Sequence, residues 1–289
     1  MVPMPLRIRC REISAADVDG VVNLLTSGFR ERTRDFWVCA LNRLSRHSNP
    51  PGTPKYGYLL ECQRRPVGVL LLIWSVIEVG GEQKIRCNVS SWYVEPSFRS
   101  YAGMLVSHAL KRRHVTYFNI TPDPATFPIL AAQGYTRYCS GRFLSAPAFS
   151  LRQSDARVNL VNSDIYPDAD LPLFETDLLR AHADYGCISV TCGAADRRHP
   201  FVFLPQRTFG VVPFAYLAYC RRLDEFVHFA GPLGRFLAKR GFPFVVLDAN
   251  GPIEGLTGKY SDGQPKYFKG PDQPRLGDIA YTERVMFGF

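Results

Sequence analysis

The sequence has no apolar run long enough to cross a membrane. The longest one, Val67–Ile77, has 11 residues, and a membrane-spanning helix needs roughly 20. Its β-branched residues favour a buried strand instead. The start of the chain, MVPMPLRIRC, lacks the long apolar core of a secretory signal. We therefore expect no membrane span and a cytoplasmic location.

Metal-binding and hydrolase signatures are also missing. The cysteines form no Cys-x-x-Cys pair, and no histidine pair has zinc-ligand spacing. No Gly-x-Ser-x-Gly motif is present, which excludes the hydrolases that depend on it. Most cysteines lie inside apolar runs, so we expect reduced core residues and no metal site. The cysteines are Cys10, Cys39, Cys62, Cys87, Cys139, Cys187, Cys192 and Cys220.

The positive charge is confined to one half of the sequence. Residues 1–146 hold 19 Lys and Arg against 10 Asp and Glu, a net charge of +9, whereas residues 147–289 hold 16 of each. A basic field of this kind favours a polyanionic partner, either a nucleic acid or a small phosphate-rich molecule. No nucleic-acid-binding motif is present, so we expect no nucleic acid. A basic surface without a partner is the alternative.

The composition, 46% hydrophobic and 21% charged over 289 residues, is that of a globular protein of about two domains. A weak internal repeat supports this, because similar segments recur about 130 residues apart. GYLLEC and PVGVLLL, which begin at Gly57 and Pro66, resemble GCISVTC and PFVFL. Farther on, ALKRRHVTYFNI resembles LAKRGFPFVVLD. We predict one domain at residues 1–146 and a second at 147–289.

Apolar periodicity predicts helices and strands in both domains. In the first, Ser14 caps an amphipathic helix, followed by a helix, three strands, a helix, a strand, a helix and a strand. Their predicted ranges are 33–46, 58–63, 67–79, 85–94, 102–113, 115–120, 123–133 and 135–143. In the second, we predict a strand at 157–161, a helix at 172–184, two strands, a β-rich stretch at 211–230, a helix at 233–239, a strand at 243–248, an ordered loop at 250–277 and a last strand at 280–287.

One stretch, WYVEPSFRSYAGMLV from Trp92 to Val106, combines the features of a phosphate-binding turn. A strand ends at Val94, a short loop with small residues follows, and a helix begins. Loop amides and the positive end of the helix then point at one place. They can bind a pyrophosphate there without many cationic side chains.

These residues resemble the GCN5-related N-acetyltransferase (GNAT) family. Its signature is a strand, then V-x-P-x-(Y/F)-R, then (R/Q)-x-x-G-x-(G/A) and a helix, and Val94, Pro96, Phe98 and Arg99 fall on that pattern. The resemblance covers about residues 7–145 and, more faintly, 170–289. It implies an α/β (α+β) fold with a mixed, mostly antiparallel GNAT-like sheet flanked by helices, present twice in tandem.

The resemblance also implies a cofactor and its site. In this family the loop and helix hold the pyrophosphate of acetyl-CoA or another acyl-CoA, and the edge of the preceding strand pairs with the pantetheine arm. Ala102 and Met104 stand where the family has Gly and Gly or Ala, so we expect cofactor binding to be weakened. The implied cofactor-binding residues are Tyr93, Val94, Arg99, Ser100, Tyr101, Ala102, Gly103 and Met104.

The catalytic acid and base are not assigned by the sequence. Family members commonly use a Glu on the central strands and a Tyr in a later helix, and this chain has Leu130 at the Tyr position. Glu95 is one candidate base. Tyr93, Tyr101 and Tyr135 are candidate acids, although each is more often a packed aromatic.

We therefore predict an acyl-CoA-dependent N-acyltransferase. It would transfer an acetyl or other acyl group directly to an amine or hydroxyl of an unknown small-molecule or protein acceptor. The alternative is a catalytically inactive GNAT-fold binding or scaffold protein, which Ala102, Met104 and Leu130 favour. In both cases we expect the second domain to have lost cofactor binding. The acyl chain length and the oligomeric state stay open.

Overall fold

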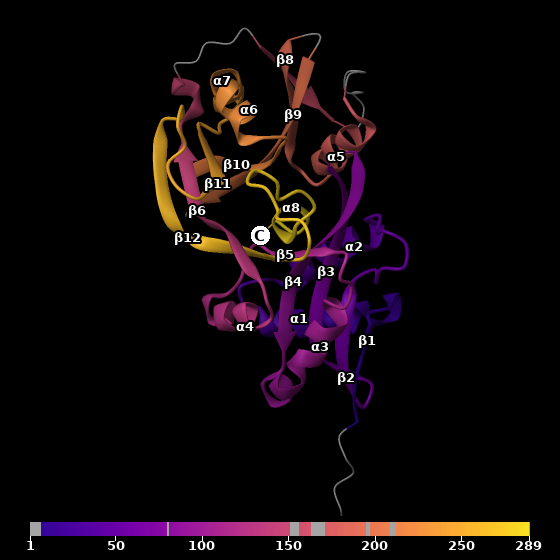
Figure 1. Ribbon diagram of the computed structural model, residues 1–289. Coiled ribbons are helices and arrows are strands. Elements are labelled where there is room, and N and C mark those ends of the chain that lie inside the picture. Colours follow the sequence, from indigo (N-terminus) through magenta and orange to yellow (C-terminus); the bar gives the residue numbers. More distant parts are fainter. Residues whose placement is uncertain are drawn as a thin grey trace, which may run out of the picture. The chain divides into compact units, whose positions relative to one another are not determined.

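The computed structural model describes residues 7–79, 81–150, 156–162, 171–194, 197–208 and 212–288, which form two compact units (Figure 1). Unit 1 consists of Met1–Asn119, Phe268–Gln273 and Tyr281–Phe289, and unit 2 of Ile120–Tyr267 and Pro274–Ala280. The boundary between the compact units therefore lies at Ile120 rather than at residue 146. The division at that residue, drawn from the sequence repeat, stays a prediction about the two copies.

The sheet of unit 1 has the strand order β1-β2-β3-β4-β5. These strands are β1 (Ile8–Glu12), β2 (Gly57–Cys62), β3 (Arg65–Val79), β4 (Glu82–Val94) and β5 (Thr116–Asn119). The first four form an antiparallel meander, and β5 pairs parallel with β4. The sequence did not indicate β1, because Arg9 and Arg11 interrupt its apolar pattern. Charged residues of this kind are typical of edge strands.

Local capping explains where the first helices of unit 1 begin. The helices are η1 (Ala15–Asp17), α1 (Val18–Gly28), α2 (Arg34–Arg46), η2 (Pro96–Tyr101), α3 (Ala102–Ala109) and α8 (Glu283–Met286). Ser14 and Asp17 form a capping box before α1, and the Thr33 side chain caps α2. The strand predicted at 280–287 is wrong, since α8 forms there. A short apolar run fits either structure.

The sheet of unit 2 has the strand order β12-β6-β11-β10-β9-β8-β7. These strands are β6 (Thr136–Ser145), β7 (Arg157–Val161), β8 (Ile188–Ala194), β9 (Arg197–Thr208), β10 (Val212–Cys220), β11 (Phe244–Ala249) and β12 (Gly258–Lys269). β7 to β10 form an antiparallel meander, whereas β11 is parallel to β10 and antiparallel to β6. The helices are η3 (Pro124–Thr126), α4 (Phe127–Ala132), η4 (Pro147–Phe149), α5 (Leu173–Asp184), α6 (Leu223–His228) and α7 (Ala230–Ala238). The β-rich stretch predicted at 211–230 is wrong after Cys220, where α6 forms, because a short apolar run fits either structure.

The loop predicted at 250–277 is wrong, because β12 runs through this region. Lys266 is the one buried residue among the 12 of this strand. Gly258, Gly263 and Pro265 are also unusual in a strand. The sequence of β12 therefore carries neither an alternating apolar pattern nor a β-rich composition, and only its pairing in the sheet reveals it.

The two units repeat one arrangement of elements. In unit 1, the antiparallel strands β2, β3 and β4 precede α3 and the parallel strand β5, and in unit 2, β8, β9 and β10 precede α7 and the parallel strand β11. The segments matched in the sequence fall on these pairs of elements. The weak sequence repeat is therefore also a repeat of structure.

Within the described ranges, every helix is too short or too polar to act as a membrane span. All eight cysteines are free thiols, and six of them are buried, which confirms their predicted place in the core.

Candidate functional site

β4 and β5 diverge after a short parallel ladder. The ladder covers Arg86–Asn88 and Thr116–Phe118, whereas β4 continues to Val94. In the part of the chain that the structure describes, β5 pairs with no residue of β4 beyond Asn88. The last residues of β4 therefore have β3 on one side but have left β5 on the other.

A β-bulge marks this part of β4. Val69 and Leu71 of β3 lie opposite Tyr93 and Ser90 of β4, so β4 has one residue more than β3 between the two pairs. Ser91 lies in the bulge and has a φ of 51°. Because a bulge bends its strand and re-aims the groups that follow, β4 changes direction just before it ends.

Two backbone groups at the end of β4 point away from β3. The Glu95 N–H donates to the Val67 carbonyl on the β3 side (2.9 Å). Since successive residues of a strand direct their backbone groups to opposite sides, the Val94 N–H and the Trp92 carbonyl face the edge that β5 has left. A ligand with amide groups can bind to such an edge as an added strand does.

The turn after β4 is a 3₁₀ helix that runs directly into α3. η2 ends at Tyr101, and α3 begins at the next residue. The Phe98 N–H donates to the Glu95 carbonyl (2.9 Å), and the Ala102 N–H donates to the Arg99 carbonyl. These two amides are therefore bonded within the turn, and anion binding would depend on the other groups of this segment.

The predicted cofactor-binding residues divide into exposed and packed ones. Arg99, Ser100, Tyr101 and Gly103 are exposed, and a Cβ added to Gly103 would meet no atom within 4 Å. The turn thus presents a cationic side chain, two hydroxyl groups and an open backbone position to solvent. The more buried residues are Tyr93, Val94, Ala102 and Met104.

Packing holds the side chains at the end of β4. The Tyr93 ring lies against Gly28 of α1, where an added Cβ would come within 2.5 Å of it, and its centroid is 6.2 Å from that of Phe29. Val94 is 7% exposed and contacts Gly68. A ligand along this edge would therefore meet mainly the backbone of β4.

Glu95, the candidate base, is held in an ion pair. Arg65 binds both carboxylate oxygens of Glu95, at 2.5 and 2.9 Å, and its guanidinium lies 5.9 Å from the centroid of the Phe98 ring. The pair fastens the start of η2 to β3. Both carboxylate oxygens are thus engaged by Arg65, so the geometry disfavours Glu95 as the base.

Of the remaining catalytic candidates, Tyr101 is exposed and Tyr135 is packed. Leu130, which stands at the family's Tyr position, is 4% exposed in α4, and its carbonyl accepts the Tyr135 N–H (3.0 Å). Tyr135 is 7% exposed. Across the described residues, no group of three or more His, Cys, Asp or Glu side chains is placed to hold a metal ion. The structure thus assigns neither a catalytic acid nor a metal ligand.

The C-terminal segment reaches the point where β4 and β5 diverge. Asn88 is 0% exposed. Its Nδ2 donates to the Phe118 carbonyl on β5 (3.2 Å), and its Oδ1 accepts the Glu283 N–H (2.9 Å). Arg43 of α2 donates to the Met286 carbonyl (2.7 Å). Sequence reasoning missed this contact because the residues are far apart in the chain.

Replacing Asn88 with alanine is expected to lower the free energy of unfolding of unit 1 by about 2 kcal/mol, because it leaves the Phe118 carbonyl and the Glu283 N–H without their buried partner. Urea unfolding followed by tryptophan fluorescence measures this, since all three tryptophans lie in unit 1. Asn42→Ala, at an exposed position in α2, is the control. Equal stability of the two variants would show that Asn88 does not hold the segment.

Comparison with known proteins shows the fold. The sequence matches no protein-family model and no curated protein. The structure is similar to that of a GCN5-related N-acetyltransferase from Anabaena variabilis ATCC 29413, with a TM-score of 0.61 over 91% of this chain and 72% of that chain, at 14% identity. A GCN5-related N-acetyltransferase from Kribbella flavida gives a TM-score of 0.56 over 91% and 71%, also at 14% identity. The chain has the fold of these proteins, as its sequence predicted.

Proposed function

We propose that unit 1 binds acetyl-CoA or another acyl-CoA and transfers the acyl group to an amine or hydroxyl of a small-molecule or protein acceptor. The observation that carries this proposal is the edge of β4, which leaves β5 after Asn88 and leads into the exposed turn at Arg99–Gly103. The fold supports it, since similar structures are those of GCN5-related N-acetyltransferases. The cytoplasmic location stays a prediction.

The edge of β4 suits the pantetheine arm of an acyl-CoA. This arm contains two amide groups, and an extended chain of amides can bind a strand edge through backbone hydrogen bonds. The Val94 N–H and the Trp92 carbonyl would be its partners. Such binding needs no particular side chain, which agrees with the packed side chains of this edge.

The exposed turn suits the pyrophosphate. Arg99 supplies a cation, and Ser100 and Tyr101 supply hydroxyl donors. The positive charge of residues 1–146 adds a field that attracts a polyanion. The side chains of the turn thus offer the pyrophosphate a positive charge and hydrogen-bond donors, although the Phe98 and Ala102 amides are already bonded within the turn.

Direct transfer is the chemistry that fits this arrangement. The acceptor nitrogen or oxygen attacks the thioester carbon, the C–S bond breaks, a base takes the acceptor's proton, and the CoA thiolate takes up a proton. Backbone amides of β4 would polarise the thioester carbonyl. Cys10, whose thiol contacts the Met104 carbonyl (3.8 Å), is unsuited as a nucleophile, since burial raises its pKa to about 11.

A second candidate is a GNAT-fold binding or scaffold protein without activity. Leu130 in place of the family's Tyr, the ion pair that holds Glu95, and the bonded amides of Phe98 and Ala102 favour it. The two candidates differ in turnover. Release of the CoA thiol from acetyl-CoA in the presence of a panel of primary amines distinguishes the enzyme from the scaffold.

Calorimetric titration with acetyl-CoA tests the proposed site. Arg99→Ala is expected to raise the Kd about tenfold, because an exposed charge next to a phosphate contributes about 1–1.5 kcal/mol. Arg113→Ala removes the same charge from another exposed position of unit 1 and is the control. Failure of the wild type to bind acetyl-CoA, or equal binding by both variants, would contradict the assignment of the turn.

A further inference from the structure

β10 of unit 2 repeats the features of β4. Its parallel ladder with β11 ends at Tyr216 and Val246, and its register with β9 shifts between Leu217 and Tyr219. A bulge therefore lies just past the parallel ladder, as it does in β4. The strand continues to Cys220, so its last residues have also left their parallel neighbour.

Residues Gly277–Ile279 occupy this edge of β10. The Cys220 N–H donates to the Gly277 carbonyl (2.8 Å), and the Ile279 N–H donates to the Ala218 carbonyl (2.9 Å). The two segments are antiparallel. The chain's own backbone thus adds to β10 as a short strand would.

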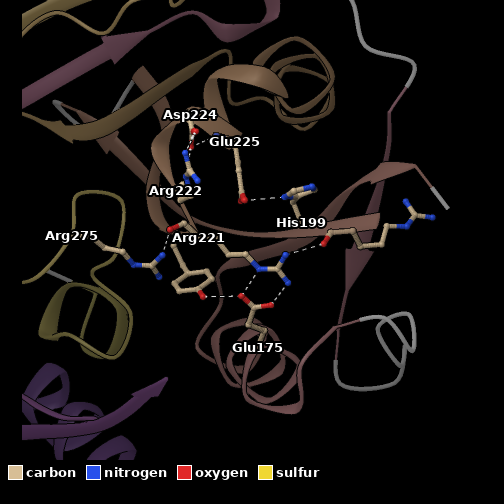
Figure 2. Close-up of polar contacts among 9 residues, drawn as sticks. Glu175, His199, Arg221, Arg222, Asp224, Glu225 and Arg275 are labelled. Carbon is tan, nitrogen blue, oxygen red and sulfur yellow. Dashed lines mark hydrogen bonds and ion pairs between the residues drawn. The ribbon is translucent and has the colours of Figure 1, made fainter. Parts of the chain in front are cut away.

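Arg275, which precedes this segment, binds the end of β10. Figure 2 shows Arg275 at the Arg221 carbonyl and Arg221 at Glu175. Arg275 donates to the Arg221 carbonyl and to Asp278 (3.1 and 3.3 Å), and its guanidinium lies 5.1 Å from the centroid of the Tyr219 ring. Arg221 in turn binds both carboxylate oxygens of Glu175, which is 1% exposed and also accepts from the Tyr219 hydroxyl (3.1 Å). Arg275 therefore links the segment to the end of β10, and Arg221 links the end of β10 to α5.

The occupied groups of β10 match those of β4. The first residue that pairs again after the bulge is Tyr93 in β4 and Tyr219 in β10. The carbonyl of the residue before each tyrosine and the N–H of the residue after it therefore correspond in the two units. These groups belong to Trp92 and Val94 in unit 1 and to Ala218 and Cys220 in unit 2. In unit 1 they are the groups proposed for the pantetheine arm, and in unit 2 the chain itself bonds them.

We propose that the edge of β10 is a second binding site for the pantetheine arm of an acyl-CoA and that Gly277–Ile279 occupy it in place of this ligand. The inference rests on the proposed function, because it assigns to β10 the ligand proposed for β4. A peptide and a pantetheine arm offer the same amide groups to a strand edge, so the segment is a chemically matched occupant. The wild-type chain then binds one acyl-CoA.

The second site would bind acyl-CoA more weakly than unit 1. The structure describes every residue between β10 and α7. Leu223–His228 form α6, and the exposed Arg222 before it is paired with Asp224. The first residues of α7, Ala230–Leu233, are buried. A Cβ on Gly234 would lie 2.2 Å from the Ala148 backbone nitrogen. The pyrophosphate would therefore find no counterpart of the Arg99–Gly103 turn.

Gly277→Ala is designed to displace the segment. Gly277 has a φ of +78°, and a Cβ there would lie 2.7 Å from the Cys220 Sγ. Hydrogen exchange, measured with and without acetyl-CoA, should show faster exchange at residues 217–220 and 274–280 in this variant. Added acetyl-CoA should slow exchange at 217–220 in the variant and leave this region unchanged in the wild type.

Two further proteins make the result decisive. Gly241→Ala places the same substitution at a φ of +87° in unit 2, where a Cβ meets no atom within 4 Å, and should not release the segment. The double variant Arg275→Ala/Asp278→Ala removes the Arg275 contacts without adding bulk and should give the same acetyl-CoA protection as Gly277→Ala.

The inference would be overturned if the variants exchange faster at 217–220 and 274–280 but acetyl-CoA does not slow exchange at 217–220. It would also be overturned if neither Gly277→Ala nor the double variant exchanges faster than the wild type. The same experiment also tests acetyl-CoA binding by unit 1 separately. Protection of residues 92–94 by acetyl-CoA in the wild type tests the proposed function, whatever happens at β10. The two hypotheses can therefore fail independently.

Discussion

Replacing Gly103 with glutamate is expected to weaken acetyl-CoA binding about 100-fold. The exposed turn at Arg99–Gly103 is the proposed pyrophosphate site, and a new carboxylate there would repel the ligand. A unit charge about 6 Å from a phosphate charge costs about 2.8 kcal/mol at an effective dielectric constant of about 20, which corresponds to about 100-fold in Kd. Calorimetric titration at low and at physiological ionic strength measures the effect, which salt should reduce.

The fold should tolerate this change. Gly103 is exposed in the first turn of α3, and a Cβ there meets no atom within 4 Å. Glutamate is a better helix former than glycine by about 0.5–1 kcal/mol, and an acidic residue in the first turn interacts favourably with the helix dipole. The melting temperature should therefore not fall, so a loss of binding would report on the site.

Gly103→Gln is the matched control. Glutamine has nearly the shape of glutamate but no charge, so it should weaken acetyl-CoA binding far less. If both variants bind as tightly as the wild type, the pyrophosphate does not lie at this turn. If both lose binding equally, steric exclusion rather than charge is responsible, and the site approaches Gly103 closely.

The sequence predicted the parts of the site that are contiguous in the chain. β4, the turn after it and α3 follow one another between Trp92 and Val106, so a single stretch carried their signals. The apolar pattern of β3 and the cap at Ser14 were equally local. For these elements, the spacing of apolar residues and the chemistry of the cap agree with the structure.

The remaining parts depend on pairings between distant segments. Asn88 and Glu283 are 195 positions apart, and nothing near Asn88 in the sequence indicates that it accepts a backbone N–H. Gly277–Ile279 adds to β10 through backbone bonds alone, which leave no pattern in the side chains. No pattern in the sequence therefore indicates that the chain itself occupies one strand edge.

Replacing Lys266 with methionine is expected to lower the free energy of unfolding of unit 2 by about 3–5 kcal/mol. Lys266 and Asp248 are 0% and 2% exposed, and the lysine Nζ lies 2.5 Å from Asp248 Oδ1 and 3.3 Å from the Tyr216 hydroxyl. Tyr216 also donates to Asp248. Methionine fills a similar volume but leaves a buried carboxylate without its counter-charge.

Hydrogen exchange of β10 and β11 measures this loss, because the tryptophans lie in unit 1 and do not report on unit 2. Lys259→Met, at an exposed position of the same strand, should change the stability by less than about 0.5 kcal/mol. The double variant Lys266→Met/Asp248→Asn removes both charges and should recover part of the loss. Equal stability of Lys266→Met and the wild type would show that the pair contributes nothing.

The pH dependence gives a second test of the same pair. Burial lowers the pKa of Lys266, but the charge of Asp248 and the neighbouring Tyr216 and Cys139 outweigh burial and raise this pKa above its ordinary value. A group whose pKa is raised by folding contributes stability that is complete below its unfolded pKa and is lost as the pH rises through the folded pKa. The difference between the wild type and Lys266→Met should therefore stay constant from neutral pH to about 10 and shrink only above it. A difference that shrinks already near a pH of about 8 would mean that burial lowers the pKa of this lysine instead.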